Sequence, residues 1–188
     1  LIANDESLGV HSVHNAMYIV IASPVGSYYP EGINPVKIMI ETKDVRAVRG
    51  GTGYAKCGGN YAASSRAGEI AEKKGFSQVL WLDGVERKYV EEFGAMNVMF
   101  KIDGTVVTPA LTGSILPGVT RKSCIQLLQD MGIPVEERLL SVDELIDAAQ
   151  SGRLEEAWGC GTAAVVSPIG ELSYEGVSHA VSYTHLTL

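Results

Sequence analysis

The 188-residue sequence predicts an α/β fold of the α+β type, with mixed, largely antiparallel sheets and flanking helices. Three observations predict it. Short apolar runs rich in β-branched residues recur along the chain, some of these runs are joined by Asp-Gly turns, and three segments have the residue pattern of helices. Because hairpins join several of the strands, a purely parallel nucleotide-binding sheet fits poorly.

The first half of the chain reads as strands interrupted by one helix. Apolar runs predict five strands there: AMYIVIASPVG (16–26), VKIMIET (36–42), VRAVRG (45–50), SQVLWLDG (77–84) and VERKYVEE (85–92). Pro24 and Gly26 end the first run, which predicts a buried strand. Residues 60–74 predict a helix, because their alanines and an isoleucine recur on or near one face. The last two runs are expected to pair as a hairpin around an Asp-Gly turn.

The second half predicts a hairpin, two helices and a return to strand. NVMFKIDGTVVTPAL (97–111) places two apolar runs around an Asp-Gly pair, the strongest hairpin signal of the chain. A helix is expected over residues 120–131, with Gly132 as its stop. Ser141 and Glu144 form a capping box that opens another helix, which runs to about residue 150. Residues 155–172 then return to strand.

Composition narrows the functional classes. The net charge of −7 argues against a nucleic-acid or anionic membrane partner. No apolar run approaches the roughly 20 residues that a membrane-spanning helix needs. Cys57, Cys124 and Cys160 are odd in number and far apart, and no histidine lies near a cysteine at ligand spacing, so neither a disulfide framework nor a metal site is expected. This cysteine content favours the interpretation that the protein is cytoplasmic.

The stretch GGTGYAKCGGNYAAS (50–64) holds five glycines around a single lysine, Lys56. It begins like a dinucleotide-binding fingerprint, but Lys56 replaces the last glycine, and it also departs from the P-loop pattern. Taken alone, such a lysine is most often a solvated loop residue. The functional alternative is an amine in a tight pocket, where desolvation favours the neutral, imine-forming state.

Three further stretches can carry chemistry. GSILPGVTRKS (113–123) starts a helix whose first amides could bind a phosphate, although Thr120 could equally be a simple N-cap. In YVEEFGAMN (89–97), at most one of Glu91 and Glu92 is expected to point inward, because neighbouring strand residues face opposite ways. In WGCGTAA (158–164), two glycines would allow a close approach to backbone amides. Each signal is weak by itself.

Together and in this order, these stretches resemble the branched-chain amino acid aminotransferases, which are fold-type IV enzymes that use pyridoxal 5′-phosphate. The resemblance runs from about residue 7 to 176. It is carried by GGTGYAKCGGNYAAS, QVLWLDG, EFGAMN, ILPGVTR and GTAAVV. It implies the large domain of that fold and an enzyme that moves the amino group of leucine, isoleucine or valine onto 2-oxoglutarate.

The resemblance also implies roles for individual residues. Lys56 matches the catalytic lysine that holds the cofactor as an internal aldimine and moves the proton at the substrate Cα. Glu92 matches the carboxylate that pairs with the pyridine nitrogen. Tyr61 matches the tyrosine that hydrogen-bonds the phenolic oxygen of the ring, and Leu116 matches the side chain packed on the ring face.

The remaining matches concern phosphate and substrate. The phosphate site is expected at Gly118, Val119, Thr120 and Thr162. The substrate-binding positions are expected at Tyr28, Gly161, Thr162 and Ala163. The family further implies a homodimer or larger homo-oligomer that binds branched-chain amino acids and 2-oxo acids, and no metal.

Two other activities share this fold, those of D-amino acid aminotransferases and aminodeoxychorismate lyases, and a non-catalytic cofactor-binding fragment remains an alternative from another class. The resemblance divides the chain into an interdomain segment with a first strand (1–30) and the cofactor-binding large domain (31–180). The small N-terminal domain and the last elements of the family are expected to lie outside this sequence. VSYTHLTL (181–188) resembles a translated sequencing adapter, so a non-native tail is expected.

Overall fold

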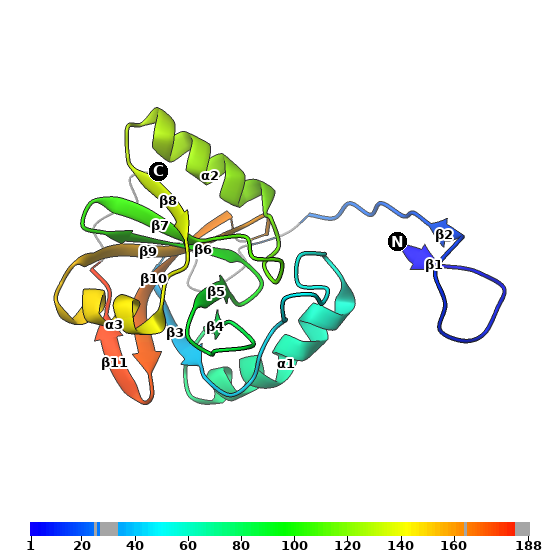
Figure 1. Ribbon diagram of the computed structural model, residues 1–188, viewed down its shortest axis with the longest axis horizontal. Helices are drawn as coiled ribbons and strands as arrows, with labels where there is room; N and C mark the ends of the chain where they lie inside the picture. Colours follow the sequence, from blue (N-terminus) through cyan, green and yellow to red (C-terminus); the bar gives the residue numbers. More distant parts are fainter. Residues whose placement is uncertain (25, 27–33, 164, 183–188) are drawn as a thin grey trace.

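The computed structural model describes residues 1–24, 26, 34–163 and 165–182. In this part of the chain a curled mixed sheet carries three helices, and an N-terminal hairpin with an extended segment projects away from it (Figure 1). The mixed α/β class expected from the sequence is confirmed. The helices are α1 (Gly58–Lys73), α2 (Val119–Asp130) and α3 (Val142–Gln150).

The sheet has nine strands within the described residues. They are β3 (Val36–Glu41), β4 (Gln78–Leu82), β5 (Val90–Phe93), β6 (Asn97–Ile102), β7 (Thr105–Pro109), β8 (Val135–Arg138), β9 (Leu154–Gly161), β10 (Val165–Tyr174) and β11 (Val177–Ala180). Their order is β5-β4-β3-β10-β9-β6-β7-β8, with β11 beside β10. The pairs β10–β3, β3–β4 and β7–β8 are parallel, whereas the other pairs are antiparallel.

The connection between β5 and β6 forces the sheet to curl. β5 lies at one end of the strand order and β6 lies deep inside it, yet only residues 94–96 separate them in the chain. Backbone hydrogen bonds between Phe93 and Met96 close this turn. Glu92 on β5 is therefore held close to the start of β6 and to the strands beside it.

Apolar side chains pack in three clusters around the sheet. The largest fills the inside of the curl and includes Phe93, Phe100 and Leu145. A second lies under α2, where Cys124 and Leu128 meet Trp158. A third lies under α1, where Ala67 and Ala71 meet Val79 and Trp81. Small residues on α1 let this helix lie close to the sheet, which fixes the position of the loop before it.

Several local predictions are confirmed. The hairpin β6–β7 turns at Asp103 and Gly104, whose φ values of 50° and 75° are the left-handed pair that a two-residue hairpin turn requires. The Ser141 hydroxyl accepts the Glu144 N–H at 3.1 Å and caps α3. Helix α1 begins two residues earlier than expected, and α2 is displaced by one residue at each end.

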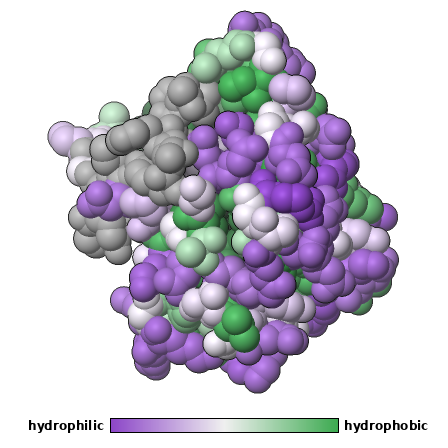
Figure 2. Space-filling view, turned by 90° about the vertical axis from the view of Figure 1, so that its left-hand side faces the viewer, coloured by the Kyte–Doolittle hydropathy of each residue, from purple (hydrophilic) through white to green (hydrophobic). Residues whose placement is uncertain are grey.

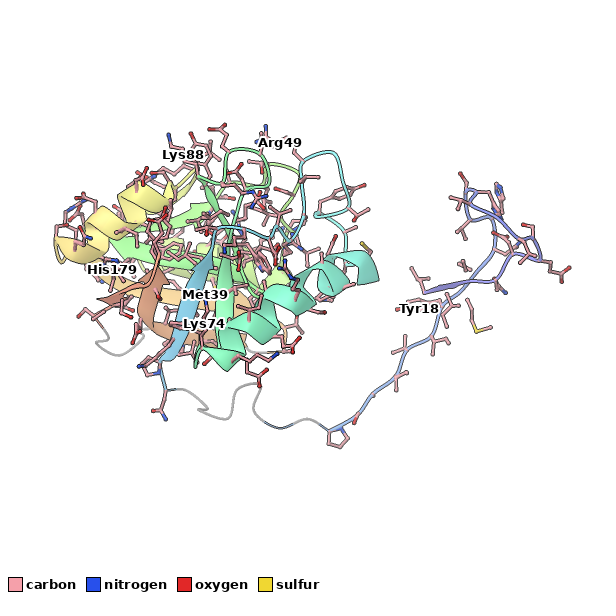
Figure 3. All side chains as sticks on the ribbon, turned by 90° about the horizontal axis from the view of Figure 1, so that it is seen from below. Tyr18, Met39, Arg49, Lys74, Lys88 and His179 are labelled. Carbon is pink, nitrogen blue, oxygen red and sulfur yellow. The ribbon has the colours of Figure 1, made fainter. Side chains whose placement is uncertain are left out.

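The buried strand expected over residues 16–26 is wrong. Only β2 (Ala16–Met17) is a strand, paired with β1 (Ile2–Ala3), and residues 18–24 are extended and exposed. Figure 3 shows Tyr18 on this arm, far from Met39 and Lys74 in the sheet domain. An apolar run becomes a buried strand only where neighbouring strands and a core surround it, and the described residues supply none here.

Three other strand predictions need correction. Residues 45–50 form a loop, because Arg46 turns inward and bonds to backbone carbonyls instead of joining a sheet. Of VERKYVEE, only the last residues belong to β5, while the Asp83 carboxylate accepts four backbone N–H groups and folds the preceding residues into a turn. Residues 155–172 contain two strands, β9 and most of β10, and β8 and β11 were not expected.

The side of the domain that carries α3 and β11 is covered mostly by hydrophilic residues, with smaller hydrophobic areas between them (Figure 2). Among the helices of the described residues, none combines the length and the apolar character needed to cross a membrane.

Candidate functional site

Lys56 lies in the loop that leads into α1, and its amine meets Tyr61 from the first turn of that helix. The distance from Lys56 Nζ to Tyr61 Oη is 2.9 Å, and Nζ lies 5.3 Å from the centre of the tyrosine ring. Lys56 is exposed, and Tyr61 is 38% exposed. The expectation of a desolvated lysine in a tight pocket is therefore wrong for the described residues, which leave one side of the amine open.

The glycine-rich loop is held by the buried side chain of Asn60 and by the close packing of Gly53 against Ser114. Asn60 donates from Nδ2 to the carbonyls of Thr52 and Ala55, at 2.9 and 2.8 Å. The loop lies so close to Ser114 that a Cβ on Gly53 would collide with the Ser114 carbonyl. By contrast, a Cβ on Gly59 would meet nothing within 4 Å. Some of these glycines thus allow the loop to pack, and others leave space beside Lys56.

Glu92 is the most completely built part of the site. Its side chain is buried, Oε1 accepts the Leu116 N–H at 2.8 Å, and Arg46 Nη2 lies 3.2 Å from the same oxygen. Burial raises the pKa of Glu92 to about 7, against the opposing effects of the Arg46 charge and the Leu116 N–H. Near neutral pH this carboxyl can hold or release a proton.

Both adjacent glutamates of β5 are buried, which corrects the expectation that at most one would point inward. Their side chains do face opposite ways, as strand geometry requires, but β5 is covered on both faces. Glu91 accepts a hydrogen bond from the Ser114 hydroxyl, whereas Glu92 meets the Leu116 backbone. An alternation rule assumes one solvent face, and this curled sheet has none at β5.

A small hollow, here called the Glu92 hollow, brings three of the expected residues together. Tyr61, Glu92 and Leu116 line it, with Arg46 and Asn60 among its other residues, and Lys56 adjoins it through Tyr61. Two larger hollows lie elsewhere in the described residues, one beside Glu91 and one near Arg66. Tyr61 and Glu92 thus line the hollow and the Lys56 amine lies next to it, so we take the Glu92 hollow as the candidate site although it is small.

The start of α2 is not capped by a side chain. Gly118 is the N-cap residue, so Thr120 lies inside the first turn and the reading of Thr120 as an N-cap is wrong. The first turn contains no acidic residue, and Val119 is 79% exposed. Asn97 donates from Nδ2 to the Leu116 carbonyl at 2.8 Å, and a Cβ added to Gly118 would force the Asn97 Oδ1 to move. This contact fixes the open end of the helix near Glu92.

The Gly161–Ala163 turn follows β9 at the same end of the sheet. Cys160 on β9 pairs with Asn97, the residue that holds the α2 start, and Thr162 and Ala163 are exposed. Added Cβ atoms on Gly159 and Gly161 would press on the Phe93 and Met96 side chains. Those glycines therefore make room for the β5–β6 turn, which is a packing reason that the sequence did not reveal.

The expected residues are not all brought together, and sequence reasoning missed two others. Tyr28 lies outside the described residues. Asn97 bonds to the Leu116 carbonyl just before α2 and pairs with Cys160 on β9, two residues before Thr162. The missed residues are Arg46, whose loop was expected to be a strand, and Asn97, which stands inside the EFGAMN stretch but carried no assigned role. A buried arginine among apolar residues gives no local signal of its inward orientation.

Comparison with known proteins agrees with this arrangement. The amino-transferase class IV family model matches residues 2–172. The chain is 58% identical over 175 residues to branched-chain-amino-acid aminotransferase 2 of Bacillus subtilis, covering 93% of this chain and 48% of that protein. The chain thus spans about half the length of the curated relatives it matches.

Solved structures show the same fold. The branched-chain aminotransferase of Thermoproteus uzoniensis, solved with norvaline, superposes with a TM-score of 0.73 at 27% identity, over 88% of this chain and 51% of that one. The branched-chain amino acid aminotransferase of Thermobaculum terrenum, solved in its PLP-form, gives 0.65 at 26% identity, over 76% and 44%. By its sequence match and its fold, the chain belongs to the class IV amino-transferase family.

Proposed function

We propose that the chain is the cofactor-binding part of a branched-chain amino acid aminotransferase, which moves the amino group of leucine, isoleucine or valine onto 2-oxoglutarate. One observation carries the proposal: Glu92, with its buried carboxyl, and Tyr61 line one hollow, and the Lys56 amine lies next to that hollow, where it donates to the Tyr61 hydroxyl. The names of the relatives, at up to 58% identity, favour the branched-chain substrates.

The residues at the Glu92 hollow fit pyridoxal 5′-phosphate. The buried carboxyl of Glu92, when ionised, would balance the charge of a protonated pyridine nitrogen. The uncapped start of α2 presents backbone N–H groups and the positive end of a helix dipole, which suit a phosphate. Lys56 leaves its amine accessible for the carbonyl of the cofactor. When bound, the group supplies a ring that accepts the electron pair released at the substrate Cα.

Each residue of this chain then has a definite task. Lys56 Nζ removes the proton from the substrate Cα, and Tyr61 Oη, at 2.9 Å, orients that amine. Glu92 holds the proton at the pyridine nitrogen, and Arg46 and the Leu116 N–H keep its carboxyl in place. Leu116, which lines the Glu92 hollow, would pack against the ring face.

Phosphate and substrate carboxylate are assigned to the far side of the Glu92 hollow. We assign the phosphate to Gly118, Val119 and Thr120 with help from Thr162, and the substrate carboxylate to the exposed turn Gly161, Thr162 and Ala163. The support is that Asn97 ties the α2 start to the end of β9. Tyr28 is assigned to the side-chain pocket from the resemblance alone.

The wider organisation of the protein is also a proposal. Residues 31–180 would be the large domain, residues 1–30 the segment that leads into it, and residues 181–188 a non-native tail. The three cysteines are free thiols, which supports a cytoplasmic enzyme. A homodimer or larger homo-oligomer is proposed from the family resemblance.

A chimaera tests the activity. This chain replaces the matching half of Bacillus subtilis branched-chain-amino-acid aminotransferase 2, and the product is assayed with valine and 2-oxoglutarate, then with D-alanine. The proposal predicts turnover of valine and none of D-alanine. Turnover of D-alanine alone would assign the D-amino acid activity instead, and a folded, cofactor-loaded chimaera that turns over neither would contradict an aminotransferase.

A second candidate, a cofactor-binding fragment without turnover, has one observation in its favour. Lys56 and the Gly161–Ala163 turn are open to solvent in the described residues, so water can reach the reacting atoms. The 188-residue chain alone is therefore expected to bind the cofactor weakly and to leave valine unchanged. Transamination by the chain alone at the rate of the chimaera would contradict this expectation.

A further inference from the structure

Two adjacent buried carboxylates share one buried cation. Glu91 and Glu92 are 5% and 3% exposed, and they leave β5 on opposite sides. The guanidinium of Arg46 is also buried and lies 3.2 Å from Glu92 Oε1. One positive charge cannot neutralise two carboxylates in a medium that screens poorly, so the state of each carboxyl depends on the other.

Ser114 connects Glu91 to this cation. Its hydroxyl donates to Glu91 Oε1, and its backbone carbonyl accepts from Arg46 Nη2. A second acceptor, the Gly53 carbonyl, lies 3.1 Å from the same nitrogen of Arg46. Glu91 thus bonds to Ser114, whose carbonyl binds Arg46, and Arg46 in turn contacts Glu92.

The network is incompletely paired. Glu91 Oε2 and Arg46 Nε are buried without a hydrogen-bond partner among the described residues. Glu91 and Ser114 also line a second hollow, here called the Glu91 hollow, which lies away from Lys56 and Tyr61. A buried carboxylate with an unpaired oxygen costs stability, and this one lies next to the serine that binds Arg46.

The charged groups around the two carboxyls are few. On the Glu91 side they are Arg46, Arg49 and Asp83, with Glu86 and Tyr89 also lining the Glu91 hollow. On the Glu92 side they are Arg46 and Lys56. Figure 3 places Arg49 near the edge of the domain that also carries Lys88, away from Met39 and Lys74. Arg46 is therefore the cation in direct contact with Glu92.

We infer that Glu91 is a positioning residue for Glu92: through Ser114 it helps to hold Arg46, and its negative charge offsets part of the Arg46 charge. This inference rests on the proposed function for its catalytic meaning, since the negative charge of Glu91 favours the proton that Glu92 and the pyridine nitrogen would share. Burial is the main cause of the raised pKa of Glu92, and the charge of Glu91 acts in the same direction.

The ligand-free chain tests the coupling directly. The side-chain carboxyl signal of Glu92 is followed by NMR against pH in the 188-residue protein, in Glu91→Gln and in Glu86→Gln. Removing the charge of Glu91 leaves Arg46 unopposed, so the midpoint of Glu92 should fall by about 0.5 to 1 pH unit. Glu86 is an exposed glutamate of the Glu91 hollow, and its variant should leave the midpoint unchanged.

A second variant guards against misfolding. Ser114→Ala removes the hydroxyl that donates to Glu91, which favours the protonated form of Glu91 and should lower the Glu92 midpoint by a smaller amount. Circular dichroism shows whether each variant keeps its fold. An unchanged Glu92 midpoint in a folded Glu91→Gln or Ser114→Ala variant, or an equal shift in Glu86→Gln, would overturn the inference.

The loaded chimaera separates this inference from the proposed function. With pyridoxal 5′-phosphate bound, kcat and the cofactor absorbance are each measured against pH. In Glu91→Gln the alkaline limb of both profiles should move to lower pH by about as much as the Glu92 midpoint moves in the ligand-free chain. If the ligand-free midpoint shifts and the loaded protein does not respond, the role of Glu92 at the ring nitrogen is wrong and the coupling stands. If the ligand-free midpoint does not shift, the coupling itself is wrong.

Discussion

The two sides of the Glu92 hollow are built to different degrees. On one side, Glu92 is 3% exposed and is held by Arg46 and by the Leu116 backbone. On the other side, Tyr61 is 38% exposed and Tyr54 is 60% exposed. The Lys56 amine there contacts Tyr61, which lies in the first turn of the helix that follows the Lys56 loop. In the sheet domain, the Glu92 carboxyl is thus buried and fully held, which we call the finished side, whereas the Lys56 amine is exposed to solvent, which we call the open side.

This difference has a physical origin. Glu92 lies on β5, which is enclosed because the sheet curls, whereas Lys56 lies in a loop at the start of α1 whose outer side faces solvent. The finished side is therefore expected to control proton affinity and stability in this chain alone. The Lys56 amine on the open side is expected to take part in catalysis only when further protein or cofactor covers it.

The largest expected effect is at the open side. Lys56→Ala in the chimaera should lower valine turnover by roughly 10³-fold or more, because the variant loses the base that acts at the substrate Cα. Lys73→Ala is the control, since Lys73 is an exposed lysine of α1 that pairs with Glu69. Stopped-flow or coupled assays measure both, and comparable losses in the two variants would remove the special role of Lys56.

The next effect is at the finished side. Glu92→Gln should lower turnover by about 10²-fold, because a neutral amide cannot balance a protonated pyridine nitrogen. The control is Glu86→Gln, which removes an exposed carboxylate of the same charge and should keep wild-type turnover. Steady-state kinetics at saturating cofactor make the comparison, and a wild-type rate in Glu92→Gln would show that the buried carboxyl is structural only.

The stability of the chain should depend on pH through Glu92. Its pKa is raised by burial from about 4.5 to about 7, so the folded state binds the proton more tightly than the unfolded state. Stability is then highest below pH 4.5 as far as this group is concerned, and it falls as pH rises to about 7. The loss is on the order of 3 kcal/mol at most.

Urea unfolding between about pH 5 and 8 measures this loss. Wild type should lose stability relative to Glu92→Gln across that range, because the amide does not titrate. The difference between the two proteins isolates Glu92 from the other titrating groups. A constant difference at all pH values would mean that Glu92 is ionised throughout and that Arg46 outweighs burial.

The smallest effect sharpens the account of the glycine-rich loop. Gly53→Ala should lower the unfolding free energy by about 1–3 kcal/mol, because its Cβ collides with the Ser114 carbonyl. Gly68→Ala in α1, where an added Cβ meets nothing within 4 Å, should raise it by about 0.5–1 kcal/mol. Chemical unfolding distinguishes the two, and equal behaviour would mean that the loop does not pack closely on Ser114.

Local signals predicted much of the fold. The Asp103–Gly104 turn, the Ser141 cap and the alanine face of α1 each act within a few residues, and the structure confirms them. The arm of residues 16–24 shows the limit of such signals, since an apolar run is buried only where other segments cover it. Pairing of β7 with β8 depended on contacts that no local pattern shows, whereas β10 and β11 join at a local two-residue turn, Glu175–Gly176, which the sequence analysis missed.

The site was predictable only where its contacts are local in the sequence. Lys56 and Tyr61 are five residues apart on one loop and helix, so their contact follows from local geometry. Arg46 meets Glu92 across 46 positions of sequence, and Ser114 meets Glu91 only because the sheet curls. The expectation that at most one of Glu91 and Glu92 points inward failed because alternation says which way a side chain points and not what lies there.

The most direct test of the central claim locates the attachment of the cofactor. The chimaera is loaded with pyridoxal 5′-phosphate, reduced with borohydride and digested, and mass spectrometry identifies the modified lysine. The account predicts the phosphopyridoxyl group on Lys56, and loss of that labelled peptide in Lys56→Ala with Lys73 and Lys122 unmodified. Stoichiometric labelling of Lys73 or Lys122 in place of Lys56 would contradict the assignment of the site.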